Sequence, residues 1–413
     1  MTTRFTRRAA AGLTAALTAC LLLAQQEEEP LGVNHSDCTL FTERGAEMRR
    51  ASPAYEGRRL WERSARTAEV TALLAAPRAI PGGSRTDIFQ QLDRLGPIDA
   101  HLFRAMMEAG VTPAPPAGDY EFLRRVSLDL TGRIPSPERV QSFAADPRPE
   151  KRDRLIGELL ASPEWADKWA MFFGDLFRNT ARTTQVVRYA EGRDAFHKWI
   201  QDSLRANKPY DRIARELIAS SADNSWERGE VNWLVGGFVT GSPRGGQDIY
   251  DQQAANVAET FLGVSHFNCI LCHDGRRRLN ELGVWGAQAT RLEAWGLAAF
   301  FAKTGMTRQV VSQQPLRYYW RVTDNPRLPD YPLNTTTGNR PPRSPIGAIS
   351  SVRPQYPWSG EQPAQNENYR EALARFLTAD LQFSRAIVNY LWKEFFGRGL
   401  VEPVNQFDPL RLD

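Results

Sequence analysis

The five residues from Cys269 to His273 constrain this 413-residue chain more than any other feature of its sequence. They read Cys-Ile-Leu-Cys-His, the C-x-x-C-H pattern of c-type haem attachment. Two thiols at this spacing can each form a thioether with one haem vinyl group, while the adjacent imidazole becomes an axial ligand of the iron. The pattern therefore predicts a covalent haem c bound by Cys269 and Cys272, with His273 as the proximal iron ligand.

Other uses of these residues remain open at this point. The two cysteines could form a disulfide or redox pair, or bind zinc together with His273 and a fourth ligand elsewhere. For a haem, the sequence does not assign the distal ligand. Met306 is the candidate, because it follows the next expected helix at a point from which a returning loop could reach the iron. His266 and His197 are the other candidates, although packing or surface roles are the simpler interpretation of all three.

The N-terminus has the layout of a signal peptide. Arg4, Arg7 and Arg8 precede an uncharged, mostly apolar run over residues 9–24, and a polar, acidic stretch follows. We therefore predict a signal peptide over residues 1–24 and export to the periplasm or the cell surface. Haem is attached to c-type cytochromes after export, so the two predictions agree. Lipidation of Cys20 or an uncleaved signal would instead anchor the protein to a membrane.

Composition excludes several classes of function. The chain has 52 Lys and Arg against 48 Asp and Glu, and no basic stripe alternates with aromatic residues, so we expect no nucleic-acid partner. Four cysteines are too few for a disulfide scaffold of this length, and Cys38 is left without an assigned role. The sequence contains no phosphate-binding glycine loop, no G-x-S-x-G elbow and no H-E-x-x-H pair. No catalytic residue is predicted, and whether the protein is an enzyme stays open.

Apolar residues recur at helical spacing over most of the chain, which predicts a mainly α fold. After the signal peptide we expect a leader region over residues 25–95 and a multi-helical domain with the motif over residues 96–303. A long, irregular, Pro-rich connector follows over residues 304–365, or an insertion with short strands around residues 318–322. Residues 366–413 return to helix as a C-terminal segment.

Several sequence segments within these helices resemble those of a known family, DUF1549, whose members are also called planctomycete cytochrome-like or PSCyt2 domains. The segments are Phe122-Leu-Arg-Arg-Val-Ser-Leu-Asp-Leu-Thr-Gly132, Leu159-Leu-Ala-Ser-Pro-Glu-Trp165, Asn207-Lys-Pro-Tyr-Asp211 and the motif itself. Residues 383–402 are similar to the opening of DUF1553, the usual partner module, so residues 366–413 are predicted to be an incomplete DUF1553-like segment.

The resemblance implies an exported, cytochrome-like, monohaem protein that acts in electron transfer, or as a redox module, with a redox partner that it does not identify. The alternative is a non-haem binding or scaffold protein of the cell surface, with a disulfide or zinc site at Cys269 and Cys272 and a link to polysaccharide degradation. The sequence differs from the usual family pattern in the residues after Asp274. The family's second histidine is replaced here by Gly275-Arg276-Arg277-Arg278, which could neutralise haem propionates or form a solvated turn.

Overall fold

The computed structural model describes residues 96–411, apart from residues 112, 114, 115, 241–245, 281, 282 and 337. The predicted signal peptide with Cys20, and the leader region with Cys38, lie outside the described residues, so these predictions stay predictions. Among the helices that the structure describes, none is both long enough and apolar enough to cross a membrane.

The first described helices form a small unit with its own core. Helix α4 (Pro97–Glu108) buries none of its residues. Helices α5 (Asp119–Thr131), α6 (Pro137–Ala145) and α7 (Lys151–Leu160) enclose a cluster of Leu123, Phe143 and Leu155. Helix α6 begins at Pro137 in the sequence Ser-Pro-Glu, and the Ser136 hydroxyl accepts a hydrogen bond from the Arg139 backbone N–H at 3.2 Å, as an N-cap does.

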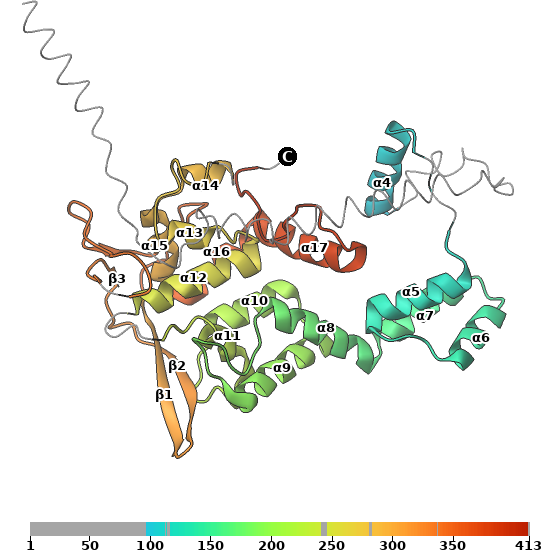
Figure 1. Ribbon diagram of the computed structural model, residues 1–413, viewed down its shortest axis with the longest axis horizontal. Helices are drawn as coiled ribbons and strands as arrows, with labels where there is room; N and C mark the ends of the chain where they lie inside the picture. The colour runs from blue at the N-terminus through green and yellow to red at the C-terminus, as the bar shows by residue number, and fades with distance from the viewer. Residues whose placement is uncertain are drawn as a thin grey trace, which may run out of the picture. The chain divides into compact units, whose positions relative to one another are not determined.

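A larger core holds most of the remaining elements together (Figure 1). The helices that contribute to it before the motif are α8 (Pro163–Leu176), α9 (Tyr189–Arg205), α10 (Tyr210–Ala219), η3 (Gly229–Val231), α11 (Asn232–Val235) and α12 (Gln247–Leu262). Helix α13 (Phe267–Ile270) contains the first cysteine of the motif, and α14 (Val284–Gln288), α15 (Arg291–Ala298) and η4 (Ala299–Phe301) follow the motif. Helix α12 is buried along almost its whole length, so it presents polar as well as apolar side chains to its neighbours.

The prediction of a mainly α fold is wrong, because the supposed connector contains strands. Strands β1 (Thr304–Gln313) and β2 (Leu316–Asp324) form an antiparallel hairpin, and β3 (Tyr331–Pro332) pairs with β4 (Ser351–Val352). The fold is thus mixed, with helices in the majority. On β2, the buried residues Tyr318, Trp320 and Val322 alternate with more exposed ones, which is the period of a strand with one face in the core. Short strands around residues 318–322 were one of the two alternatives that the sequence left open for this stretch, and they lie within β2.

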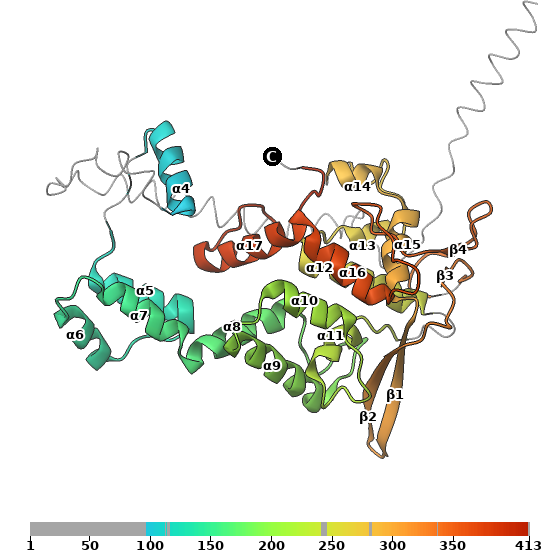
Figure 2. The ribbon, with the colours of Figure 1, turned by 180° about the vertical axis from the view of Figure 1, so that it is seen from behind.

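The C-terminal segment packs on the elements around the motif. Helices α16 (Tyr369–Ala379) and α17 (Leu381–Phe396) lie beside α10 and α12 (Figure 2). The Gln382 side chain donates a hydrogen bond to the Leu262 carbonyl at 2.7 Å, and the Phe407 backbone N–H donates to the Gly263 carbonyl at 2.8 Å. The end of α12, just before the motif, is therefore held by residues that are more than a hundred positions away.

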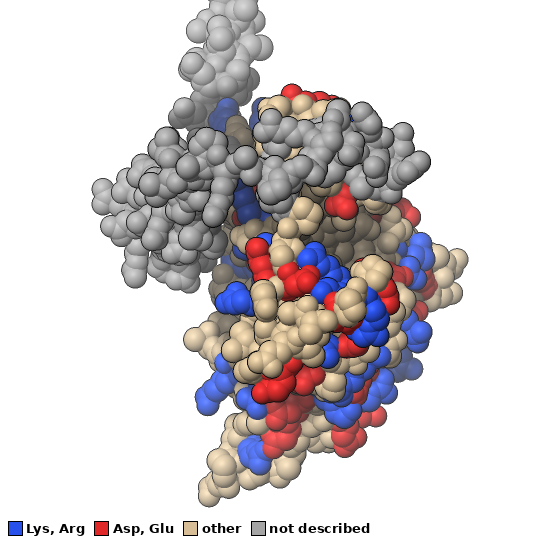
Figure 3. All heavy atoms as spheres, turned by 90° about the vertical axis from the view of Figure 1, so that its right-hand side faces the viewer, with Lys and Arg blue, Asp and Glu red and all other residues tan. Residues whose placement is uncertain are grey.

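Acidic and basic side chains are intermixed over the face shown in Figure 3. On that face they do not gather into a patch of one sign.

Candidate functional site

The motif forms a single helical turn that follows α12. Helix α12 ends at Gly263, whose φ of 67° is left-handed and whose added Cβ would lie 2.8 Å from the Phe407 ring, so glycine is required there. The backbone N–H groups of Cys272 and His273 both donate to the Cys269 carbonyl, at 3.0 and 3.2 Å. Residues three and four apart in such a turn share one face, so both thiols and the imidazole lie on the same side.

Exposure differs between the thiols and the imidazole. Cys269 and Cys272 are both half-buried, and no disulfide joins them to each other. His273 is 9% exposed. The imidazole of the motif is therefore more deeply buried than its two cysteines.

The His273 ring is oriented by its neighbour. Its Nδ1 lies 2.9 Å from the Asp274 carbonyl oxygen, a contact in which Nδ1 carries the proton and donates, so that Nε2 keeps its lone pair. Burial lowers the pKa of His273, which favours the neutral imidazole that metal ligation needs. The Asp274 carboxylate accepts a hydrogen bond from the Arg291 backbone N–H at 2.7 Å, and this contact ties the motif to the start of α15.

A segment from outside the motif covers Cys272. We call residues 338–343 the arginine strap, because its two guanidinium groups bind the surfaces around the motif. The Arg340 Nη1 lies 3.8 Å from the Cys272 Sγ, and its Nη2 donates to the Asn268 Oδ1 at 2.9 Å. Arg340 is only 7% exposed. The strap is therefore built into the site, although it belongs to the stretch expected to be irregular.

The second arginine of the strap binds α12. Arg343 is fully buried, and its Nη2 contacts Asp248 at 2.7 Å and Asp251 at 2.5 Å. Burial lowers the pKa of Arg343, but the neighbouring charges, Asp251 first, outweigh it and raise the pKa above its ordinary value. Two carboxylates and one guanidinium, all out of water, form a network that is stable only while it is complete. The Tyr331 hydroxyl completes it by donating to Asp251 at 2.8 Å.

Sequence reasoning missed this network entirely. Asp248 and Asp251 lie three positions apart on α12, which places them on one face, and this spacing was the only available signal. Arg340 and Arg343 flank two prolines in a stretch without periodicity, and nothing local indicates that they are buried.

The other predicted residues lie at separate places. Met306 is on β1, and its Sδ lies 3.9 Å from the Gln253 amide nitrogen of α12. His197 is half-buried on α9, and Arg276 and Arg277 are exposed. Within the described residues we find no hydrogen bond or ring contact that links Met306 or His197 to the motif, so the distal ligand stays a prediction.

His266 has a distinct environment just before the motif. It is 5% exposed, its ring centroid lies 5.5 Å from that of Trp285, and its Nε2 has no hydrogen-bond partner among the described residues. Burial, partly offset by Asp408, lowers the pKa of His266 to about 4. This histidine is therefore a neutral core residue at pH 7.

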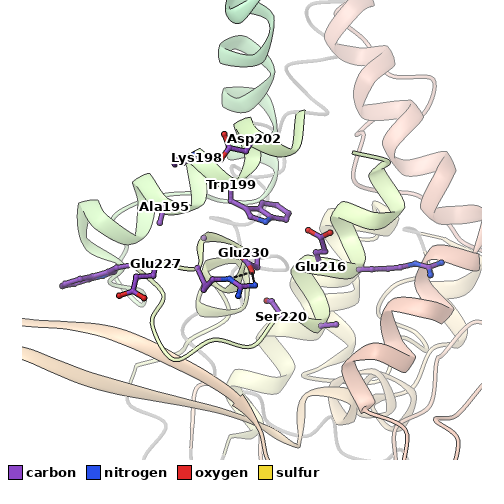
Figure 4. A pocket seen from close by; sticks show the side chains of 13 residues that line it. Ala195, Lys198, Trp199, Asp202, Glu216, Ser220, Glu227 and Glu230 are labelled. Carbon is purple, nitrogen blue, oxygen red and sulfur yellow. Dashed lines mark hydrogen bonds and ion pairs between the residues drawn. The ribbon is translucent and has the colours of Figure 1, made fainter. Parts of the chain in front are cut away.

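The residues of the turn fit covalent haem attachment. A c-type haem needs from the protein two thiols at this spacing and one oriented imidazole, and the turn supplies these three groups. A cavity of about 850 Å³ lies elsewhere in the described part of the chain, between α9 and α10 (Figure 4). In the described part of the chain, no group of three or more His, Cys, Asp or Glu side chains is arranged to hold a metal ion.

A helix-dominated domain with a partly buried C-x-x-C-H turn is the class of protein that the fold and the site define. The sequence model of a protein family of unknown function, DUF1549, named PSCyt2, matches residues 97–304, which is half of the chain. The chain belongs to this family, and the predicted resemblance to DUF1549 is confirmed. No curated protein and no solved structure matches the chain.

Proposed function

We propose that this protein is a c-type cytochrome-like redox module with one haem c attached through Cys269 and Cys272 and ligated by His273. The observation that carries the proposal is the helical turn that holds two half-buried cysteines beside an imidazole whose Nδ1 donates to the Asp274 carbonyl. Proteins hold c-type haem with this set of groups at this spacing.

The residues of the chain would bind, orient and shield the cofactor. His273 is held by the Asp274 carbonyl, and its low pKa keeps its Nε2 available to the iron near neutral pH. Asp274 and Arg291 brace the turn against α15. The bound haem would supply the one-electron chemistry, whose potential depends on the second axial ligand. Met306 is the proposed distal ligand, and substitution of Met306 by leucine changes the haem spectrum only if its sulfur binds the iron.

The cellular setting belongs to the same proposal. The N-terminal pattern at Arg4, Arg7 and Arg8 supports export to the periplasm or the cell surface, with Cys20 as a possible lipid anchor. There the module would exchange electrons with a redox partner protein. Residues 366–413 would be the opening of a DUF1553 module, as the phrase over residues 383–402 suggests.

Covalent haem is the quantity that tests the proposal. The full chain is expressed with its own N-terminus in a bacterium that carries a cytochrome c maturation system. Exported protein is then examined by a pyridine haemochrome spectrum and by haem staining of a denaturing gel. We expect a stained band that is lost completely in Cys269→Ala/Cys272→Ala, because no thioether can form.

Cys38→Ala is the matched control, since it removes a cysteine outside the motif and should leave the stained band unchanged. Exported wild-type protein without covalent haem would contradict the proposal and favour a non-haem binding protein.

A further inference from the structure

A large cavity of about 850 Å³ lies between α9 and α10, and we call it the α9–α10 groove. The residues used below to define it are Trp199 and Asp202 of α9, Glu216 and Ser220 at α10, Glu227 of the loop that leads into η3, and Glu230 of η3. Figure 4 shows Trp199 pointing into the space between the two helices, with Glu216 across from it. All lining residues fall within residues 97–304 and none belongs to the motif, so nothing proposed above accounts for the groove.

The groove has a rigid wall at Trp199. Gly229 packs so closely on α9 that an added Cβ would lie 2.2 Å from the Ala195 carbonyl oxygen, which fixes the floor against the helix. The Lys208 Nζ lies 4.7 Å from the centroid of the Trp199 ring and also pairs with Glu216 at 2.5 Å. The indole is therefore held in place, while its own N–H makes no hydrogen bond to the described residues.

Other polar groups of the groove have unused hydrogen-bonding capacity. Glu230 is 7% exposed, and its Oε1 accepts both hydrogen bonds from Arg228, at 2.9 and 2.5 Å. Its Oε2 has no partner among the described residues. Arg215 donates to the Thr378 hydroxyl through Nε at 2.9 Å, which leaves its terminal N–H groups available. The same cavity thus offers a carboxylate acceptor together with donors from an indole and a guanidinium.

These donors and acceptors of the groove favour one chemical class of ligand. Basic and acidic side chains line the groove in nearly equal number, which disfavours a ligand with a large net charge. A hydroxyl group donates and accepts at once, so it suits a surface that presents both unused donors and unused acceptors. A sugar ring adds an apolar face of C–H groups, which can stack on a flat indole. We propose that the α9–α10 groove is a binding site for a neutral saccharide.

Titration calorimetry of the full chain tests the proposal with cellohexaose, xylohexaose, laminarihexaose and chitohexaose as probes. Hexagalacturonate serves as a comparator, because it keeps the pyranose ring but adds carboxylates. We expect saturable binding of at least one neutral probe and weaker binding of hexagalacturonate, since Glu227 and Glu230 would repel it. Absence of binding to every neutral probe at millimolar concentration would overturn the proposal, as would tighter binding of hexagalacturonate or of an unstructured peptide.

Substitutions of groove residues test whether the saccharide binds in the groove. Glu230→Gln keeps the shape of the side chain and Trp199→Phe keeps an aromatic wall without the N–H, and each should weaken binding about 10-fold. Trp392→Phe on α17 is the matched control and should bind like the wild type. Unchanged affinity in both groove variants, with circular dichroism like that of the wild type, would show that the saccharide binds elsewhere and would overturn the assignment. None of these variants touches the haem attachment residues, so haem content and saccharide binding can fail independently.

Discussion

The motif turn and the α9–α10 groove differ in how their charged side chains are paired and buried, and in whether a cavity lies beside them. At the motif, charged groups are buried and mutually paired: Arg343 is bound to Asp248 and Asp251, and Arg340 lies against Cys272. In the groove, the corresponding pair of Arg228 and Glu230 has its arginine in solvent, and a cavity of about 850 Å³ separates the helices.

This difference shows that a recognisable motif and an obvious cavity need not coincide. The motif needs only two thiols and an imidazole from the chain, and the surrounding network stabilises their positions. The groove has no sequence motif, and its binding capacity comes from unused donors and acceptors around an open space. A search guided by either signal alone would find one site and overlook the other.

The largest expected effect follows from breaking the network at the motif. Arg343→Leu leaves two buried carboxylates without their guanidinium and should lower the free energy of unfolding by about 3–5 kcal/mol, measured in urea. Lys198→Leu, which removes the exposed partner of the exposed Asp202 at the groove, should cost about 1 kcal/mol or less. Equal losses in the two variants would contradict the contrast between the regions.

A second effect concerns the pH dependence of stability around His266. Its folded pKa of about 4 lies below the ordinary value of 6.5, so the folded state binds fewer protons than the unfolded state between these values. Stability should therefore fall by about 3 kcal/mol as the pH drops from about 6.5 to about 4. Urea unfolding across this range measures the change.

The His266→Gln variant supplies the control for that titration. The stability of this variant should lack the part of the pH dependence that comes from His266. The same slope in both proteins would show that His266 is not the group responsible.

The smallest effect concerns the start of α15, beside the motif. The Thr290 hydroxyl and the Glu293 side chain form a reciprocal capping box, and the adjacent Arg291 N–H binds Asp274. Thr290→Ala should lower the unfolding free energy by about 1 kcal/mol, and Thr290→Ser should restore most of it. Helix α9 at the groove begins without a side-chain cap. A measurable loss of stability in Thr290→Ala would therefore show that the motif region depends on a local capping interaction that the groove lacks. Identical stability of all three proteins would contradict this.

Much of the helical framework was predictable, since it rests on local physics. The serine of each Ser-Pro-Glu sequence, Ser136 and Ser162, accepts the hydrogen bond expected of an N-cap. Within residues 366–413, the segment expected to be helical, the structure has two helices that meet at Asp380, whose carboxylate accepts from the Gln382 N–H at 2.8 Å. Short strands around residues 318–322 were one of two alternatives for residues 304–365, and they lie within β2. The extent of the β1–β2 hairpin was not predicted, because its two-residue alternation is short and lies within a proline-rich stretch.

The amino-acid sequence by itself determined the motif, its spacing, the family and the positions of most helices, because these depend on residues close together in the chain. Only the tertiary structure decided what surrounds the motif and where the cavity lies. Arg340 contacts Cys272, which is 68 positions away in the sequence, and Arg343 contacts Asp248, which is 95 positions away. The same holds for Trp199, Glu216 and Glu230, which converge on one groove from three separate elements. A charged side chain can be buried only where other groups pair with it or hydrogen-bond to it. Here those groups belong to distant segments, so no local sequence pattern predicts the burial.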